Sequence, residues 1–257
     1  MQHSRALVRR PSQNLADGLT RADLGSPSIT LAKAQHGRYC EELQRCGLLL
    51  TVLSPDAQYP DSTFVEDTAV VTPRGAIFTR PGAESRRGEV ASIGEALLDL
   101  VPSLGEIEAP GTVDGGDVCA VDDRFLIGIS ARTNEAGARQ LATILESQGY
   151  ASTTLDLRGL PDLLHLKSGL AALDDGRLVA VSALADRDEL RGYPTLRVDE
   201  RESYAANCVS VNGRVLIARG YPLLEAALVK LRYDVVTLEM SEFRKMDGGL
   251  SCLSLRL

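Results

Sequence analysis

Residues 207–240 read NCVSVNGRVLIARGYPLLEAALVKLRYDVVTLEM, and this stretch holds the repeating unit that decides the fold. Two short apolar runs, CVSV and VLIA, lie on either side of Asn212-Gly213. An Asn-Gly pair between apolar runs is a strong signal for a two-residue β-hairpin. A helix is expected near 222–231, and the apolar run VVTLEM follows it. The stretch therefore predicts a β-β-α-β unit.

The same order of elements begins three more times upstream. A polar residue opens each copy, at 65–67, at 113–117 and at His165. The strand pairs that follow are TAVV with AIFT, VCAV with FLIGI, and GLAAL with LVAV. Self-similar segments of this kind indicate a repeat architecture. The remaining elements are expected as helices near 88–100 and 134–148 and as the strands IEAP at 107–110 and STTLDL at 152–157.

The two ends of the chain together supply a fifth unit. ALVRR at 6–10, a helix near 30–46 and LLLTVL at 48–53 give three elements, and SCLSLRL at 251–257 gives the missing strand. A repeat that uses both chain ends closes a ring. Since the sequence contains no linker and no low-complexity tract, we expect one α/β domain over residues 1–257.

Ring closure also predicts where polar side chains gather. The residues that open the units should face the central axis, although they are far apart in the sequence. Side chains that converge on a cavity from rigid strands are the usual material of an active site. The residues expected at the axis are Glu66, Asp67, Asp114, Asp117, His165, Asn207 and Asp247.

The composition is that of an ordinary globular protein. Of the 257 residues, 44% are hydrophobic, which is enough for a sizeable core. The formal net charge is −7 and the basic residues are scattered, so a basic stripe for nucleic acid is absent. No apolar run reaches the roughly 18 residues of a membrane span. The first residues lack the apolar segment of a secretory signal.

The five cysteines favour a reducing compartment. Their number is odd, no Cys-x-x-Cys pair occurs, and only three histidines accompany them. This pattern disfavours a disulfide scaffold and a zinc site. We therefore expect a cytoplasmic protein that needs no metal and keeps its thiols free.

Cys252 and His165 are the candidate reactive groups. Cys252 ends the segment MDGGLSC, and a Gly-Gly loop that runs into a strand can present a thiol at the rim of a cavity. His165 is the one histidine at the start of a unit. The alternative is that Cys252 is a buried small hydrophobe and His165 a structural residue. Core positions are expected for Cys40, Cys46, Cys119 and Cys208.

Acidic residues suggest what the cavity binds. Asp61, Glu66 and Asp67 lie close together in the sequence, and Asp114 and Asp117 flank a Gly-Gly pair. Carboxylates that share one cavity repel each other unless a cation lies among them. A guanidinium has five N–H donors in a planar fork that matches paired carboxylates. The alternative is two ordinary acidic turns.

Two arginines lie in loops between the expected elements, Arg86 in RPGAESRRGE and Arg132 in SARTN. An arginine in such a place can capture the α-carboxylate of an amino-acid substrate. The alternative is a solvated arginine at the entry to a helix.

Together these segments resemble the dimethylarginine dimethylaminohydrolase family of the guanidino-group-modifying (pentein) superfamily. The similarity extends over nearly the whole chain and follows the family order. The segments that carry it are DGLT at 17–20, YPDS at 59–62, FVED at 64–67, RPGAESRRGE at 80–89, DGGD at 114–117, SARTN at 130–134, HLKSG at 165–169, SYAANC at 203–208 and DGGLSC at 247–252.

The resemblance implies a five-bladed α/β propeller, in agreement with the repeats, and assigns roles to individual residues. Cys252 would be the nucleophile, and His165 the proton donor and general acid/base. Asp67 and Asp114 would hold the guanidino nitrogens, although position 114 is Glu in some relatives. The residues implied at the amino-acid end of the substrate are Leu19, Asp61, Glu66, Arg86, Arg132 and the backbone carbonyl of Met246.

The implied reaction is hydrolysis of asymmetric dimethylarginine or monomethylarginine to citrulline and dimethylamine or methylamine, through a thiouronium on Cys252. It needs no cofactor, and its partner is a small molecule bound by a monomer or a homodimer. Two alternatives stay open. One is an arginine deiminase or another enzyme of the superfamily, although arginine deiminases usually carry a large helical insertion. The other is a non-catalytic protein that binds guanidino compounds.

Overall fold

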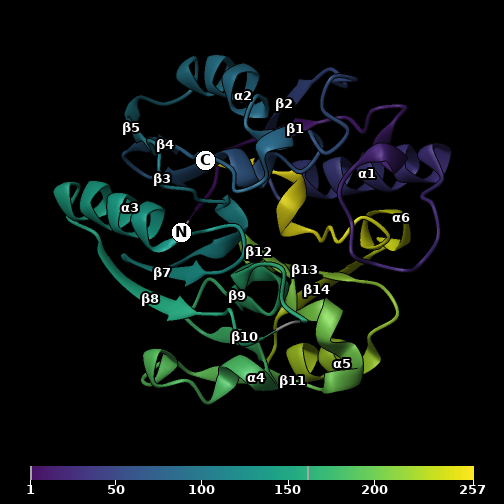
Figure 1. Ribbon diagram of the computed structural model, residues 1–257. Coiled ribbons are helices and arrows are strands. Elements are labelled where there is room, and N and C mark those ends of the chain that lie inside the picture. The colour runs from purple at the N-terminus through teal and green to yellow at the C-terminus, as the bar shows by residue number, and fades with distance from the viewer. Residues whose placement is uncertain (1, 161) are drawn as a thin grey trace.

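The computed structural model describes residues 2–160 and 162–257, and within these residues fifteen strands form five three-stranded sheets. In each sheet the first strand is antiparallel to the second, and the second is parallel to the third. Figure 1 shows the sheets around one centre with the long helices at the outside. This confirms the expected five-bladed α/β propeller.

The units follow one another along the chain. The first contains β3 (Ala69–Thr72), β4 (Gly75–Phe78), α2 (Glu89–Leu98) and β5 (Ser103–Glu106). The second contains β6 (Val118–Val121), β7 (Arg124–Ile129), α3 (Glu135–Ser147) and β8 (Ala151–Asp156). The third contains β9 (Leu170–Ala172), β10 (Leu178–Val181), α4 (Ser182–Ala185) and β11 (Thr195–Val198). The fourth contains β12 (Val209–Val211), β13 (Arg214–Ala218), α5 (Pro222–Lys230) and β14 (Asp234–Leu238), and α6 (Ser241–Arg244) follows it.

The fifth unit closes the ring with both ends of the chain. It contains β15 (Leu255–Arg256), β1 (Arg5–Arg9), α1 (Ile29–Arg45) and β2 (Leu49–Leu53). The amide of Ser4 donates to the carbonyl of Leu257 at 2.7 Å, and the amide of Leu257 donates to the carbonyl of Arg5 at 2.8 Å. The predicted closure is therefore confirmed.

Local sequence explains the turns and helices of the units. Asn212 and Gly213 both have positive φ, 49° and 85°, as a type I′ hairpin turn requires. Helix α3 begins at the N-cap Asn134, and it buries Leu141 and Leu145 on one face. Burying such a side chain stabilises the fold by about 1.5–3 kcal/mol.

Two expectations about the strands were wrong, and the sequence did not place two short elements of the third unit. The third strand of the first unit is Ser103–Glu106 and not IEAP, because Glu108 to Gly111 form a turn and Pro110 has no N–H for a ladder. In the C-terminal segment only Leu255–Arg256 is a strand. The third unit also has a helix and a third strand. Each has only four residues, which is too few to show a hydrophobic period in the sequence.

The hydrophobic core lies between neighbouring units. Four clusters of buried side chains follow the ring, and each contains residues of at least two units. The units thus bury their apolar faces against one another and leave the inner ends of the sheets to form the centre. Among the residues that the structure describes, no helix combines the length and the apolar character needed to cross a membrane.

Candidate active site

Five 3-10 turns bring the polar residues of the five units to the centre. Each turn precedes the first strand of its unit. Turns that follow each other along the chain pack together in the first four units, and the turn of the first unit also contacts that of the last. The turns are Val65–Thr68, Gly115–Asp117, Leu166–Ser168, Glu200–Ala206 and Ser251–Leu253.

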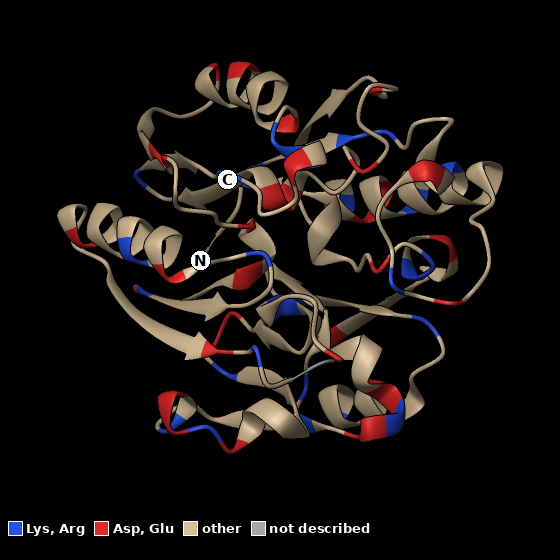
Figure 2. Ribbon diagram, viewed as in Figure 1, with Lys and Arg blue, Asp and Glu red and all other residues tan. Residues whose placement is uncertain are grey.

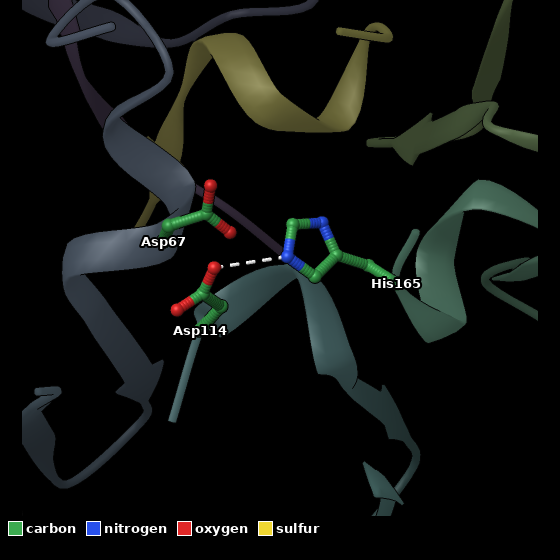
Figure 3. A group of neighbouring side chains, drawn as sticks. All are labelled: Asp67, Asp114 and His165. Carbon is green, nitrogen blue, oxygen red and sulfur yellow. Dashed lines mark hydrogen bonds and ion pairs between the residues drawn. The ribbon is translucent and has the colours of Figure 1, made fainter. Parts of the chain in front are cut away.

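Asp67, Asp114 and His165 meet at this centre, as predicted from the ring. One ligand atom of each lies within 4.8 Å of the others, and Figure 3 shows the two carboxylates beside the imidazole. Gly116 lies between them, and its amide donates to Asp67 Oδ1 at 2.9 Å. A Cβ at position 116 would lie 2.9 Å from both Asp67 Oδ1 and His165 Nδ1. The glycine is therefore required for the close approach.

Asp114 orients the imidazole. It is fully buried, and its Oδ2 lies 3.0 Å from His165 Nε2, while its Oδ1 accepts from the amide of Gly82 at 2.8 Å. Both oxygens are therefore engaged within the protein. Asp114 therefore contacts His165, and the role at the guanidino nitrogens that the resemblance implied stays a prediction.

The surrounding carboxylates control the charge of His165. Burial opposes the imidazolium, but Asp67, Asp117 and Asp114 outweigh it and raise the pKa of His165 to about 9. The pKa of Asp67 falls to about 2, because His165 and Arg86 outweigh the effect of its burial. At neutral pH His165 is thus a cation that can donate a proton.

Cys252 lies in the turn Ser251–Leu253, half-buried beside the Gly-Gly loop. The amide of Gly249 points at its sulfur, with an N···Sγ distance of 3.4 Å. Burial, together with the charges of Glu66 and Asp67, raises the pKa of the thiol to about 12. The resting group is therefore a neutral thiol.

The two arginines differ in their surroundings. Arg86 is buried, and its guanidinium binds Glu89 at 2.8 Å, Asp67 at 2.5 Å and the carbonyl of Phe64 at 3.0 Å. Arg132 is half-buried, and within the described residues its guanidinium makes no hydrogen bond or ion pair. Arg132 is therefore free to capture an anion, whereas Arg86 holds the site together.

Carboxylates outnumber cations in this buried region. Asp67, Asp114, Asp117 and Glu89 are all buried, against the two cations Arg86 and His165. Burial raises the pKa of Glu89 to about 7 and that of Asp117 to about 6. Figure 2 shows acidic stretches of ribbon near the centre of the ring. The site therefore favours a cationic guest beside a thiol and an imidazolium.

Comparison with known proteins identifies the family. The family model for arginine deiminase matches residues 59–207. N(G),N(G)-dimethylarginine dimethylaminohydrolase of Pseudomonas aeruginosa is 46% identical over 251 residues, which cover 97% of this chain and 98% of that protein. The chain belongs to the dimethylarginine dimethylaminohydrolase family. A dimethylarginine dimethylaminohydrolase of Streptomyces coelicolor is 38% identical over 100% of this chain and 98% of that protein.

Solved structures of the dimethylarginine dimethylaminohydrolase family have the same fold. A cysteine-to-serine mutant of the Pseudomonas aeruginosa enzyme, complexed with citrulline, superposes with a TM-score of 0.96 and 44% identity, and all of both chains is covered. The N-terminal domain of a cyanobacterial arginine dihydrolase superposes with a TM-score of 0.89 over 99% of this chain and 97% of that one. Its 19% identity makes it a likeness of fold alone.

Three residues implied at the amino-acid end of a dimethylarginine dimethylaminohydrolase substrate lie around a surface loop. The backbone amide of Leu19 donates to both carboxylate oxygens of Asp61, at 3.1 and 3.0 Å. Leu19 is 43% exposed, and Asp61 is buried beneath it. Met246 is buried, and no hydrogen bond to its carbonyl is found in the described part of the chain. These groups stay candidates for substrate binding.

Two predicted positions have other surroundings. Both carboxylate oxygens of Glu66 bind protein groups, Lys167 Nζ at 2.8 Å and Ser251 Oγ at 2.6 Å. Asp247 does not join the axial group, because its carboxylate accepts from the amide of Arg21 at 2.5 Å in the surface loop. The expectation that Asp247 faces the axis was therefore wrong.

Sequence reasoning missed three residues that hold the site. Glu89 follows Arg86 by three residues, and that spacing in one turn was a usable signal for an ion pair. Lys167 and Ser251 stand beside predicted site residues. Their contacts join segments that are far apart in the chain, so no local sequence pattern predicts these contacts.

Proposed function

We propose that this chain hydrolyses asymmetric dimethylarginine and monomethylarginine to citrulline and dimethylamine or methylamine. The observation that carries the proposal is the excess of buried carboxylates beside the Cys252 thiol and the protonated His165. A planar cation satisfies the carboxylates, and its guanidino carbon is the electrophile for the thiol. In this assignment Asp67 binds the guanidinium, and Asp114 holds His165.

The first half of the reaction forms a covalent intermediate. A bound guanidinium lowers the pKa of the neighbouring thiol, because a positive charge favours the thiolate. The thiol proton passes to water, and the sulfur of Cys252 bonds to the guanidino carbon. The carbon–nitrogen bond to the methylated nitrogen then breaks, and His165 gives its proton to the departing amine. A thiouronium remains on Cys252.

The second half releases citrulline. His165, now neutral, takes a proton from water, and the resulting hydroxide bonds to the same carbon. The carbon–sulfur bond breaks, and the leaving sulfur of Cys252 takes the proton of the new hydroxyl group as the ureido C=O forms, which regenerates the neutral thiol. His165 is again protonated, so the site returns to its starting charge. Asp114 keeps the imidazole in one orientation through both steps.

Related structures support these assignments. In the relative complexed with citrulline, a cysteine was changed to serine. In another solved dimethylarginine dimethylaminohydrolase, a histidine-to-glycine variant carries an adduct with S-methyl-L-thiocitrulline. Cysteine and histidine are the residue types that stand here at positions 252 and 165.

The amino-acid end of the substrate binds at the rim. Arg132 supplies a free guanidinium for the α-carboxylate, and Arg86 contributes to the same positive region from beneath. The loop that carries Leu19, anchored on Asp61, and the carbonyl of Met246 receive the α-amino group. We further propose that the enzyme works in the cytoplasm as a monomer or homodimer, which agrees with its five free cysteines.

A substrate panel tests the function. Asymmetric dimethylarginine, monomethylarginine, symmetric dimethylarginine, arginine and agmatine are supplied at matched concentrations, and citrulline, dimethylamine, methylamine and ammonia are measured. We expect the first two compounds to have the highest kcat/KM and agmatine to be poor because it lacks the α-carboxylate. The arginine deiminase model that matches this chain makes free arginine the competing substrate. Efficient ammonia release from arginine, with little dimethylamine from asymmetric dimethylarginine, would favour that activity instead.

A further inference from the structure

One buried polar network touches all five units at the axis. Lys167 Nζ donates to Glu66 Oε1 at 2.8 Å and to the carbonyl of Gly115 at 3.2 Å. Ser251 Oγ donates to the other oxygen of Glu66 at 2.6 Å. Asn207 Nδ2 donates to the carbonyl of Lys167 at 2.9 Å, and its Oδ1 accepts from the amide of Ser251 at 2.9 Å.

The members of this network are sequence neighbours of the reactive groups. Glu66 precedes Asp67, Gly115 follows Asp114, and Ser251 precedes Cys252. Lys167 stands two residues after His165. The network therefore fixes the relative positions of the four turns that carry the reactive groups. Without it, these turns are connected along the chain only through the strands and helices of whole units.

The network also borders a cavity on the axis. A cavity of about 270 Å³ is lined by the first strands of the units and by Glu66, Gly115, Lys167 and Ser251. None of the four reactive residues lines this cavity. Lys167 is the one cation of the network, so its loss leaves the buried Glu66 carboxylate beside an open space.

We propose that Lys167 is a positioning residue, whose bonds to Glu66 and Gly115 hold the turn of the nucleophile against the turns of the acid/base pair. The predicted change in kcat rests on the proposed function, whereas the predicted change in the alkylation of Cys252 does not. A displacement of about 1 Å between reacting groups costs roughly 100-fold in rate. A positioning role therefore lowers kcat and leaves KM nearly unchanged, since neither bond of Lys167 goes to the substrate.

The test compares Lys167→Met with Arg214→Met, a control that removes an ion pair to Asp234 on the neighbouring strand β14. We expect Lys167→Met to lower kcat for asymmetric dimethylarginine about 100-fold, with KM within about threefold. Lys167→Arg should recover part of the loss, and Arg214→Met should keep the kcat of the natural enzyme. A folded Lys167→Met enzyme with kcat within about threefold of normal overturns the proposal.

The double variant Glu66→Gln/Lys167→Met separates positioning from folding. Replacing both partners of a buried ion pair removes the unpaired charge that a single replacement leaves. We expect the melting temperature to recover while kcat stays low. Recovery of both quantities would make Lys167 a purely structural residue. The double variant also carries the test if Lys167→Met does not fold.

The rate at which iodoacetamide alkylates Cys252 is a second measurement, and it does not depend on turnover of a substrate. Without Lys167 the charge of Glu66 is unbalanced beside the thiol, which favours the neutral form. We expect Lys167→Met to slow alkylation at pH 8 by about 10-fold, the effect of one pKa unit, and Arg214→Met to leave it unchanged. An unchanged rate in Lys167→Met would overturn the positioning role. Failure of the substrate panel would overturn the proposed function without touching this result.

Discussion

Two cysteines stand near the axis in neighbouring units, and their thiols differ in surroundings more than in acidity. Burial raises the pKa of Cys208 to about 12, the same value that Cys252 has. Cys208 packs into a hydrophobic cluster beside Cys119 and lines the axial cavity. Cys252 lies half-buried at a Gly-Gly loop, on a turn that touches the turn of Asp67. Acidity therefore does not distinguish a nucleophile from a core residue, whereas exposure and the neighbouring charged groups do.

The largest expected effect separates these two thiols directly. Cys252→Ser should lower kcat by on the order of 10⁴-fold or more, because a serine hydroxyl is a far weaker nucleophile than a thiolate. Cys208→Ser should keep kcat within a few-fold and lose only stability. Steady-state rates and melting temperatures of both variants check this. Comparable loss of kcat in the two variants would remove the distinction between the cysteines.

The next effect concerns the groups around Cys252 that Cys208 lacks. His165→Asn removes the proton donor, and general acid/base loss typically costs about 100- to 10,000-fold. The loss should appear in release of the amine and in breakdown of the intermediate, as measured by single-turnover kinetics. Near-normal rates at neutral pH would make His165 a structural residue.

A third expected effect contrasts the free arginine with the buried one. Arg132→Ala should raise KM for asymmetric dimethylarginine by about 10- to 150-fold with little change in melting temperature, since one charge-assisted bond is worth roughly 1.5–3 kcal/mol. Arg86→Ala should also lower the melting temperature, because it leaves Glu89 and Asp67 without their partner. Equal effects of both variants on agmatine and on dimethylarginine would show that neither binds the α-carboxylate.

The smallest expected effect is a dependence of stability on pH. The pKa of His165 is about 9 in the folded chain against an ordinary value of 6.5, so its stabilisation is complete below pH 6.5 and is lost as pH rises through 9. Between pH 7 and 9 the free energy of unfolding should fall by on the order of 2 kcal/mol. Urea titrations of the natural protein and of His165→Asn measure this difference. An equal slope in the variant would assign the effect to another group.

Much of the ring could be predicted from short-range patterns. The Asn212-Gly213 pair and the apolar runs around it specify a hairpin through local backbone preferences. Repetition of that pattern then predicts five units, and the polar residue that opens each unit predicts a shared centre. The prediction failed for IEAP, where Pro110 and a turn ended the strand. The sequence patterns also did not place the short helix and strand of the third unit.

The partner that each side chain of the site binds was harder to predict. Asp114 and Glu66 were expected to face a substrate, yet their oxygens bind His165, Gly82, Lys167 and Ser251. These partners come from other units, so only the assembled fold shows them. Asp247 was expected at the axis because it opens a segment, but the loop at Arg21 takes its carboxylate. Sequence spacing thus identifies the groups at a site better than it identifies their partners.

The most direct test of the account is the site of covalent attachment during turnover. His165→Gly is mixed with asymmetric dimethylarginine or S-methyl-L-thiocitrulline, quenched in acid, and examined by intact mass and peptide mapping. The account predicts one adduct per chain, with the mass of the substrate less its leaving group, on the peptide that contains Cys252. Cys252→Ser should show none. An adduct on Cys208 or Cys119, or citrulline formed at a normal rate by Cys252→Ser, would contradict it.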